Sequence, residues 1–570
     1  MKIIRLKISS TVSLLIPLLA VFLAAAQCLA EEEPLQQQIR QWVQQLGDDS
    51  FLVRGRAESL LIRVGIQAYP ALQRAKQHPD IEIVRRAEHI LSQLEQVLLD
   101  MENREVVYWI QLYMIEPNPA LKARFIWLLA DATSDFSRGE GLQTLCRLVW
   151  FEENAALRIE AAKCLIASPP NSPALRQKWY RHIRDNTRET GDDELLQSVA
   201  HYAALWCDID DAVRETTQKA MPEFHERIRQ VGAETLRLLK RPENSIQAGS
   251  KVDILLHYAV AELQDAAGLT EERDETVAAA LAVVSEPIQT LEPILQVGLD
   301  DDMPMNEHFY VGRNLRARFR LRWAIAHYQK VIESGPVEFR LRASEEVAET
   351  FGGYLADYPS AISQYDKYIE ILNSDYAGSD MRAKMNKAQR RKTYFQAEQA
   401  AAEGNWSSVQ DLLEQIWTMP ETDNLHLFWS EDGGCDMLIL AHLLCKQQSD
   451  TSSEFIDKMT LCTKKTWISM EADYNQTPAD VRHAAMVGIC NAAAWILAKT
   501  EGDYQTALTF AETALKGAAD DASVLDTLAH VYFLGGKRDE AVRTQEQAVR
   551  LAPEAVVFRQ ALERFKQAKE

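Results

Sequence analysis

The chain of 570 residues has little that would support catalysis. Its 12 histidines are scattered, and no two of them have the His-Glu-x-x-His spacing that places two metal ligands on one face of a helix. The chain contains no Gly-x-Ser-x-Gly nucleophile turn, no phosphate-binding glycine-rich loop and no Cys-x-x-Cys-His haem site. Asp300, Asp301 and Asp302 form an acidic run, but the other ligands of a calcium loop are missing. We therefore expect a protein that is not an enzyme, with no catalytic residues, no metal and no other cofactor.

Signals for β-strands are also scarce, because no convincing run of alternating valine, isoleucine and threonine occurs. The chain has eight cysteines, and seven remain once Cys28 is set aside with the N-terminal segment described below. None of the gaps between the later cysteines has the short Cys-x-x-Cys spacing of a zinc site. Burial as thiols is the simplest interpretation, and a disulfide between Cys445 and Cys462 is the alternative. The sequence predicts an all-α protein.

Long apolar runs are confined to the N-terminus. Three basic residues among the first seven precede an apolar run from Val12 to Ala26, and small residues lead to Ala30 before three glutamates. These features are typical of a secretory signal peptide, and the run is short for a membrane span, which needs about 20 apolar residues. We predict that residues 1–30 are a signal peptide cleaved after Ala30, so that the protein is exported to a periplasmic or extracellular location. An uncleaved anchor is the alternative.

Basic residues are too few for a nucleic-acid-binding protein. The chain has 62 lysines and arginines against 83 acidic residues, so its formal net charge is −21, and loss of the signal peptide makes it more negative still. Nucleic-acid binding depends on concentrated positive charge, so no nucleic-acid partner is expected. Two local basic stretches do occur, Arg313 to Arg322 and Lys384 to Lys392. They are interpreted as helix faces that balance the acidic excess, and docking of a negatively charged partner is the alternative.

The clearest positive feature is a repeat with a spacing of 34 residues near the C-terminus. Gly502 recurs as Gly536, Ala507 as Ala541 and Ala514 as Ala548. A helix–turn–helix unit of this length cannot bury its apolar face alone and must stack on its neighbours. In the last unit, residues 522–555, the large, small and terminating residues of the pattern are Leu525, Leu528, Ala529, Tyr532, Ala541, Ala548 and Pro553.

This pattern resembles that of tetratricopeptide (TPR) repeats. A second unit, residues 305–338, matches it at His308, Val311, Gly312, Leu315, Ala324, Tyr328, Val331 and Pro336, with Gly312 at a position of close helix packing. Weaker units lie between these two. The resemblance covers roughly residues 250–570, and it predicts a TPR-type α-solenoid domain over residues 246–570.

A looser repeat occupies the N-terminal half. Arg56, Ala57 and Glu58 are echoed thirty residues later, and Arg158 and Ala161 begin a third echo. This looks like HEAT-type helical hairpins, another α-solenoid family, and an ordinary helical bundle is the alternative. We predict a HEAT-like domain over residues 31–245. The boundary is placed near residues 240–251, where proline, glycine and polar residues separate two helical regions.

The combination is similar to exported bacterial proteins with HEAT-like repeats followed by TPR repeats. That resemblance implies the fold and a binding role, and we predict a non-catalytic scaffold that binds a protein or peptide in the concave groove of the TPR superhelix. Self-association is possible. No other segment approaches the length of a membrane span, so no stable membrane insertion is expected after the signal is removed. The groove positions implied by the TPR pattern are Asn306, Phe309, Arg313 and Arg316 in one unit and Asp526, His530, Phe533 and Leu534 in the last. The alternative is an all-helical hydrolase or lyase acting on cell-wall polymers outside the cytoplasm. Its catalytic module would lie in the least repetitive stretches, residues 180–245 and 420–480.

Overall fold

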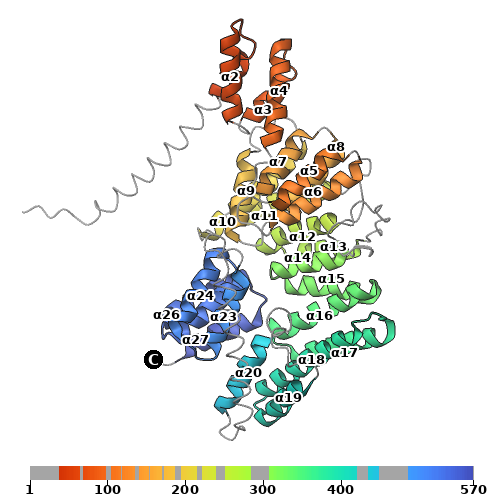
Figure 1. Ribbon diagram of the computed structural model, residues 1–570, viewed down its shortest axis with the longest axis vertical. Coiled ribbons are helices and arrows are strands. Elements are labelled where there is room, and N and C mark those ends of the chain that lie inside the picture. Colours follow the sequence, from red (N-terminus) through yellow and green to blue (C-terminus); the bar gives the residue numbers. More distant parts are fainter. Residues whose placement is uncertain are drawn as a thin grey trace, which may run out of the picture. The chain divides into compact units, whose positions relative to one another are not determined.

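The structure is a computed structural model, and it describes residues 37–568 with several gaps. The gaps are residues 65–67, 98–103, 117, 135–139, 153, 168, 170–172, 187–193, 215–220, 239–250, 284–306, 420–433 and 448–485. The described segments contain helices and turns but no strand, so the fold is all-α, as predicted (Figure 1). The predicted signal peptide and the predicted boundary near residue 245 both fall outside the described residues.

The chain forms two compact units, Met1–Glu116 and Pro117–Glu570. The first contains α2 (Phe51–Val64), α3 (Tyr69–Ala75), α4 (Ile81–Val97) and α5 (Arg104–Ile115). Ala57 on α2 and Ala87 on α4 are both fully buried in one apolar core. The thirty-residue echo in the sequence therefore corresponds to two helices that share a core, whereas the kinship with HEAT repeats stays a prediction.

The second unit begins with eight helices. Their bounds are α6 Pro119–Ser134, α7 Glu140–Phe151, α8 Ala155–Ala167, α9 Pro173–Asn186, α10 Glu194–Arg214, α11 Met221–Arg237, α12 Lys251–Ala266 and α13 Thr270–Ala282. Most residues of α8 and α12 are buried. Helix α12 contacts α8 and α11, and also α13 and α14 later in the chain. Packing is therefore continuous along the chain on both sides of residue 245.

The remaining helices form an α-solenoid of consecutive helix pairs. Their bounds are α14 Glu307–Ala317, α15 Leu321–Ser334, α16 Val337–Gly353, α17 Tyr358–Asp375, α18 Met381–Ala402, α19 Trp406–Thr418, α20 Gly434–Gln447, α23 Val487–Lys499, α24 Tyr504–Gly517, α25 Ala522–Leu534, α26 Arg538–Leu551 and α27 Val556–Gln567. Each helix packs against the next described one in the chain. Gly312 lets α14 approach α15 closely, because an added Cβ would lie 2.6 Å from the Tyr328 ring. This confirms the close-packing position that the TPR pattern predicts.

The turns inside these pairs contain residues in the left-handed region of backbone space. Three of them are glycines, Gly268, Gly404 and Gly536, and three are not: Phe319 (φ 56°), Ala356 (φ 52°) and Glu501 (φ 55°). The sequence repeat aligns Gly502 with Gly536, but the left-handed residue of the earlier turn is Glu501. Side chains with a Cβ are strained in this region, so the chain tolerates strain at three of its turns.

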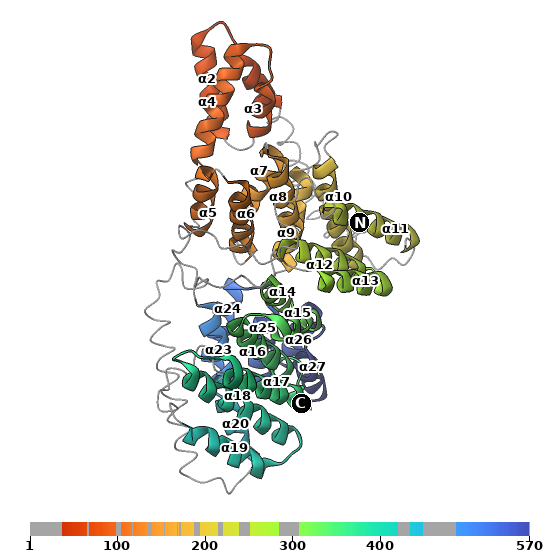
Figure 2. The ribbon, with the colours of Figure 1, turned by 90° about the vertical axis from the view of Figure 1, so that its right-hand side faces the viewer.

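The C-terminal helices contact the beginning of the solenoid (Figure 1, Figure 2). The amides of Val556 and Val557 both donate to the Tyr354 carbonyl oxygen, at 2.8 and 3.2 Å, and the Phe558 ring lies 5.9 Å from that of Phe319 and 6.4 Å from that of Tyr354. The Arg322 amide donates to the Glu554 carboxylate at 2.9 Å. These contacts are referred to below as the clasp. Because a simple solenoid joins only neighbouring repeats, the clasp is an addition to that architecture.

Candidate binding face

Charged side chains recur on α14, α16, α18, α20, α23, α25 and α27, and each of them lies close to the next. They are referred to below as the charged row: Arg316, Glu345, Glu346, Glu349, Lys387, Arg391, Glu398, Asp436, Lys499, Asp526 and Arg564. Helical geometry explains their grouping, because residues four apart share one face. Glu345 and Glu349 on α16, and Lys387 and Arg391 on α18, are such pairs.

The first part of the row consists of ion pairs between neighbouring helices. Arg316 Nη1 lies 2.5 Å from Glu346 Oε2, and Lys387 Nζ lies 3.0 Å from Glu345 Oε1. The side chains of these four residues keep between 24% and 29% of their surface exposed. Burial raises the pKa of Glu345, and Lys387 offsets the rise only in part. The carboxylate is thus incompletely neutralised.

The third ion pair in this part of the row is Arg391 with Glu349, and its carboxylate charge is neutralised more completely. Arg391 Nε donates to Glu349 Oε1 at 2.8 Å, and the Tyr365 hydroxyl donates to the same oxygen at 2.6 Å. Burial raises the pKa of Glu349, but Arg391 and Tyr365 outweigh it and hold the pKa below its ordinary value. Arg391 is buried, with its guanidinium 4.9 Å from the centre of the Tyr394 ring. This pair anchors the row on α16 and α18.

The middle of the row is acidic and lined by aromatic side chains. Glu398 accepts hydrogen bonds from the hydroxyls of Tyr394, at 2.5 Å, and Tyr358, at 3.5 Å. Asp436 on α20 lies nearby and is hydrogen-bonded by Trp495. Burial raises the pKa of both carboxyl groups above their ordinary values. A cation that approached this region would be stabilised by both.

The last part of the row gathers two cations. Lys499 Nζ lies 4.7 Å from the centre of the Trp495 ring. Burial lowers the pKa of Lys499 to about 8, and the positive charge of Arg564 adds to the effect, while Asp526, Glu398 and Asp436 oppose it. Lys499 therefore faces carboxylates from three different helices, α18, α20 and α25.

Asp526 and His530 on α25 form the buried side of this cluster. Gln545 Nε2 donates to Asp526 Oδ1 at 2.6 Å, and burial raises the pKa of Asp526 to about 6. His530 Nδ1 lies 2.9 Å from the Asp526 carbonyl oxygen, and Arg564 Nη2 lies 2.7 Å from His530 Nε2. A neutral ring with its proton on Nδ1 satisfies both contacts. Burial lowers the pKa of His530, which agrees with a neutral ring.

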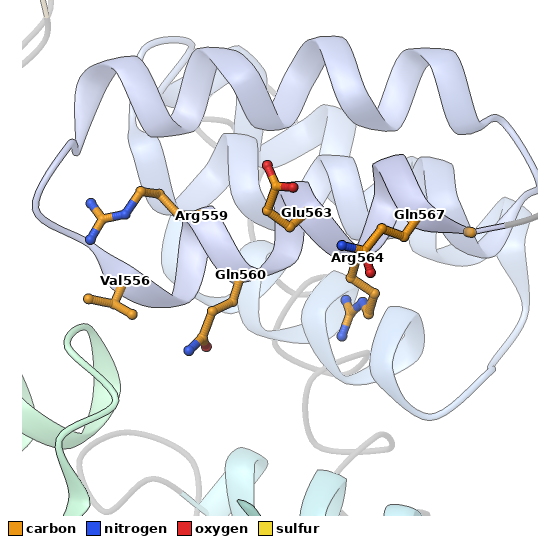
Figure 3. A pocket seen from close by; sticks show the side chains of 7 residues that line it. Val556, Arg559, Gln560, Glu563, Arg564 and Gln567 are labelled. Atoms are coloured by element: carbon orange, nitrogen blue, oxygen red, sulfur yellow. The ribbon is translucent and has the colours of Figure 1, made fainter.

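Arg564 also reaches an open surface depression of about 640 Å³ over α27 (Figure 3). In Figure 3 Arg564 and Gln560 point to one side of α27 and Glu563 to the other. The other lining residues are Val556, Arg559, Gln567 and Ala568. The lining comes from one helix and the residue that follows it, so the depression is a shallow extension of the row rather than an enclosed ligand pocket.

The predicted groove residues of α14 fall in different environments. Asn306 lies outside the described residues. Phe309 is only 3% exposed, and its ring packs 5.2 Å from that of Phe339, so it is a core residue and is not presented to a partner. Arg313 is exposed, and Arg316 belongs to the charged row. The resemblance therefore placed one core residue among its surface positions.

The predicted groove residues of α25 are brought together, but mostly below the surface. Asp526 and His530 are buried, because Gln545, Arg564 and the ring of Phe565 cover them. Phe533 is half-buried and stacks on Phe565, with ring centres 4.6 Å apart. Leu534 is half-buried and packs against the apolar core of the preceding helices. These residues lie beneath the candidate binding face, where Lys499 and Arg564 are the accessible side chains.

The 34-residue spacing could have found both of these missed cations. Counting 34 residues back from Phe533 gives Lys499, and counting 34 forward from His530 gives Arg564. The groove positions predicted for the last unit include neither cation, because Lys499 lies in the unit before it and Arg564 on the helix after it. Glu398 and Asp436 carry no comparable signal, because the repeat is weak in that part of the sequence.

The two basic stretches serve mainly to neutralise neighbouring acids. Arg318 Nη1 lies 3.2 Å from Glu262, and Arg320 Nη1 lies 2.9 Å from Asp265. In the second stretch Lys392 Nζ lies 2.5 Å from Asp366, and Lys387 pairs with Glu345. This agrees with the interpretation as charge-balancing helix faces, and it leaves few of these cations for an anionic partner.

The described residues also bear on other functional classes. The described segments contain no group of three or more His, Cys, Asp or Glu side chains placed to hold a metal ion. No helix within them has the length and apolar character to cross a bilayer. In residues 180–245 the described acids include Asp208, paired with Arg227, and Glu234, close to His201. Most of residues 420–480 lies outside the described residues.

Comparisons with known proteins give only distant similarities. No protein-family model matches the chain, and no curated protein matches it. The APC/C hetero-tetramer Cut9–Hcn1 is similar over 90% of this chain and 86% of its own, with 14% identity and a TM-score of 0.24. The match to the human IFIT1 dimer with PPP-AAAA covers 87% of this chain and 94% of that chain, with 13% identity and a TM-score of 0.21. The P58(IPK) TPR domain covers 63% of this chain and 98% of its own, with 15% identity and a TM-score of 0.14. Similarity this low carries no conclusion about function, and the fold class rests on the helices themselves.

Proposed function

We propose that the protein is a non-catalytic scaffold that binds a segment of a partner protein along the charged row. The observation that carries the proposal is the partial exposure of the first two ion pairs of the row. The Arg316–Glu346 and Lys387–Glu345 pairs keep about a quarter of their surface in solvent although protein surrounds them on several sides. Groups in this condition are desolvated enough to interact strongly and open enough to be reached.

The electrostatics of the row favour a partner segment with basic groups near its middle. Burial raises the pKa of Glu345, Glu398 and Asp436, which means that their negative charge is not fully compensated. A cationic group from a partner would remove part of that cost. Arg316 at one end and Lys499 with Arg564 at the other would receive acidic groups, so the row selects for charge order as well as charge sign.

Aromatic side chains beside the row would supply the apolar part of the contact. Trp495 and Tyr358 are half-buried next to Glu398, Asp436 and Lys499. Tryptophan, tyrosine and arginine side chains supply much of the affinity of protein interfaces where the surrounding contacts exclude water. A peptide side chain that lay on Trp495 would be within reach of both cations and carboxylates.

The test compares two matched charge pairs that both involve α18. The row variant carries Glu345→Gln and Lys387→Gln, and the control variant carries Asp366→Asn and Lys392→Gln. Lys387 and Lys392 are five residues apart and so lie about 140° apart around the helix. Each double substitution removes one acid and one base from half-exposed or exposed positions, so little loss of stability is expected from either.

Wild-type protein and both variants would be used for affinity capture from an envelope extract. The proposal predicts a partner that the wild type and the control variant retain and the folded row variant loses. Equal retention by all three would remove the charged row as the binding face. Export is a separate proposal, and the N-terminal sequence of the protein from its native cells tests it: Glu31 as the first residue is expected, and Met1 would contradict cleavage.

A further inference from the structure

The clasp joins turns, whereas the rest of the solenoid is joined by helix faces. One side of the clasp is Phe319, in the turn after α14, together with Arg322 and with Tyr354, in the turn after α16. The other side is Glu554, in the turn between α26 and α27, together with the first residues of α27, Val556 and Phe558. Among the described helices, none of α14–α17 packs along any of α23–α27.

The clasp closes a circuit of contacts. From α14 to α20 each described helix contacts the next, α20 contacts α23, and contacts continue to α27. The clasp then joins the start of α27 back to α14 and α16 through 232 residues of intervening chain. The charged row runs along helices of this same circuit, and its two ends, Arg316 and Arg564, belong to the two sides of the clasp.

Tyr354 connects the clasp directly to the row. Its carbonyl oxygen accepts the amides of Val556 and Val557, and its ring lies 5.7 Å from the guanidinium of Arg316. Val556 in turn lines the depression that Arg564 reaches. Separation of the clasp would therefore move the Arg316 end of the row away from the Arg564 end.

Lys499 lies between the two sides of the circuit. It interacts with Glu398 and Asp436 on α18 and α20, and also with Asp526 and Arg564 on α25 and α27. Because α20 and α23 are the other joint of the circuit, opening the clasp would turn α23–α27 away from α18 and uncover Lys499. In the closed arrangement Lys499 is only partly accessible.

We propose that the clasp is a gate that opens to admit a partner segment to the charged row and closes behind it. This rests on the proposed function of the row. The clasp is the joint that opens because its contacts are local. Its polar contacts are two amides on one carbonyl oxygen and one amide on a carboxylate, and the rings of Phe319 and Tyr354 pack with Phe558 against one small apolar cluster of α25, α26 and the turn after α26. Local opening selects contacts of this kind, while long helix faces stay packed. The left-handed φ of Phe319 shows that this side of the clasp is already held in a strained conformation.

The gate can be tested without a partner, because Lys499 reports access to the row. The full-length protein and two variants, Phe558→Ala and Glu554→Ala, would be treated with acetic anhydride for short times, and acetylation of individual lysines would be followed by mass spectrometry. Lys516 is exposed on α24 and serves as the internal control. Hydrogen exchange at the amides of Val556 and Val557 would show directly whether the clasp has opened, and circular dichroism would show that each variant is folded.

The expected result is that clasp amides exchange faster and Lys499 is acetylated about tenfold faster in Phe558→Ala, with a smaller change in Glu554→Ala and none at Lys516. Faster amide exchange with an unchanged rate at Lys499 would overturn the gate, because the clasp would then open without exposing the row. Unchanged amide exchange in both folded variants would also overturn it. Failure of the proposed function would be distinguishable from failure of the gate. The row variant and the control variant would then retain the partner equally, while acetylation of Lys499 would still be faster in the clasp variants.

Discussion

Two lysines in this protein make ion pairs of nearly the same length in very different surroundings. Lys163 on α8 lies 2.9 Å from both Glu160 and Asp253, and no more than 8% of any of these side chains is exposed. Lys387 on α18 lies 3.0 Å from Glu345, and both side chains keep about a quarter of their surface in solvent. The distance alone does not separate the two pairs. Exposure does, and it separates charges that hold the fold from charges that a partner can reach.

The buried network joins parts of the chain that are far apart in sequence. Trp127 Nε1 donates to Glu160 at 3.0 Å, so α6 joins the network at this carboxylate, and α8 and α12 meet at the Lys163 ammonium group. Burial lowers the pKa of Lys163, but the two carboxylates outweigh it and raise the pKa above its ordinary value. The lysine thus stays charged inside the protein, and its removal would leave two carboxylates without their counter-ion.

The largest expected effect comes from Lys163→Met. Removing one partner of a buried ionic network is expected to lower the free energy of unfolding by about 3–5 kcal/mol. Lys387→Met, the matched change in the charged row, is expected to cost about 1 kcal/mol or less, because its pair is partly solvated. Urea denaturation of both variants checks the contrast. Equal losses would mean that exposure does not distinguish the two sites.

A smaller effect is expected where the helices that carry the row pack most closely. An added Cβ at Gly352 would overlap the Phe395 ring, whereas one at Gly353 would meet no neighbouring atom. Gly352→Ala is therefore expected to lower the free energy of unfolding by about 1–3 kcal/mol. Gly353→Ala is the control and is expected to be neutral or to stabilise by up to about 1 kcal/mol. Thermal unfolding of the two variants in parallel would measure this difference. A loss of stability in Gly353→Ala as large as that in Gly352→Ala would contradict the close contact between Gly352 and Phe395.

The buried region and the row should also differ in the sign of their pH dependence. Tyr258 and His308 contact His327 at 2.7 Å each, and burial together with the neighbouring His308 and Lys330 lowers the pKa of His327 to about 3. The folded state then binds fewer protons than the unfolded state, whose histidine titrates near 6.5. The contribution of His327 to the free energy of unfolding is therefore complete above about pH 6.5 and is lost as the pH falls toward 3.

This loss amounts to about 2 kcal/mol between pH 7 and pH 5. The measurement is the change in unfolding free energy over that interval for wild type and His327→Gln, and the wild type should lose more by about that amount. Glu345 has the opposite sign, because its raised pKa makes the folded state gain relative stability as the pH falls. Identical pH dependence in wild type and His327→Gln would show that this histidine does not titrate differently in the two states.

The smallest effects concern the strained turns. Ala356→Gly relieves a left-handed φ of 52° and is expected to change stability by about 1 kcal/mol in the favourable direction, less the greater entropy of glycine in the unfolded chain. Gly404→Ala introduces the same strain at an uncrowded turn and is expected to cost about 1 kcal/mol. Melting temperatures of both variants are sufficient to detect these changes. A stabilising Gly404→Ala would contradict the assignment of strain.

Sequence periodicity predicted the parts of this fold that depend on neighbouring residues. The 34-residue repeat predicted the pairing of α23 to α26, and the alanines Ala507, Ala541 and Ala548 are all fully buried, as helix contacts require. The same repeat placed Phe309 and His530 on a surface, and both are buried. A repeat position fixes which way a side chain points from its own helix, but it does not say whether another helix covers it.

The clasp and the middle of the charged row could not have been predicted in this way. Arg322 and Glu554 meet across 232 residues, and a repeat pattern carries information only about adjacent units. The clasp depends on the combined geometry of all the helix pairs between Arg322 and Glu554. The spacing of residues within one repeat carries no information about that geometry. Asp436 similarly acquires its role only because α20 brings it beside Glu398 and Trp495.

The most direct test of this account measures stability and partner retention together in Lys163→Met and Lys387→Met. Urea unfolding and affinity capture from the same envelope extract would be carried out on each purified variant. We predict that Lys163→Met loses much of its stability but, at a temperature where it remains folded, still captures the partner. Lys387→Met should keep its stability and, because it leaves Glu345 without its counter-ion, capture more of a partner with basic groups than the wild type does. A folded Lys387→Met protein that captures the partner as well as the wild type would contradict the central claim that the charged row is the binding face.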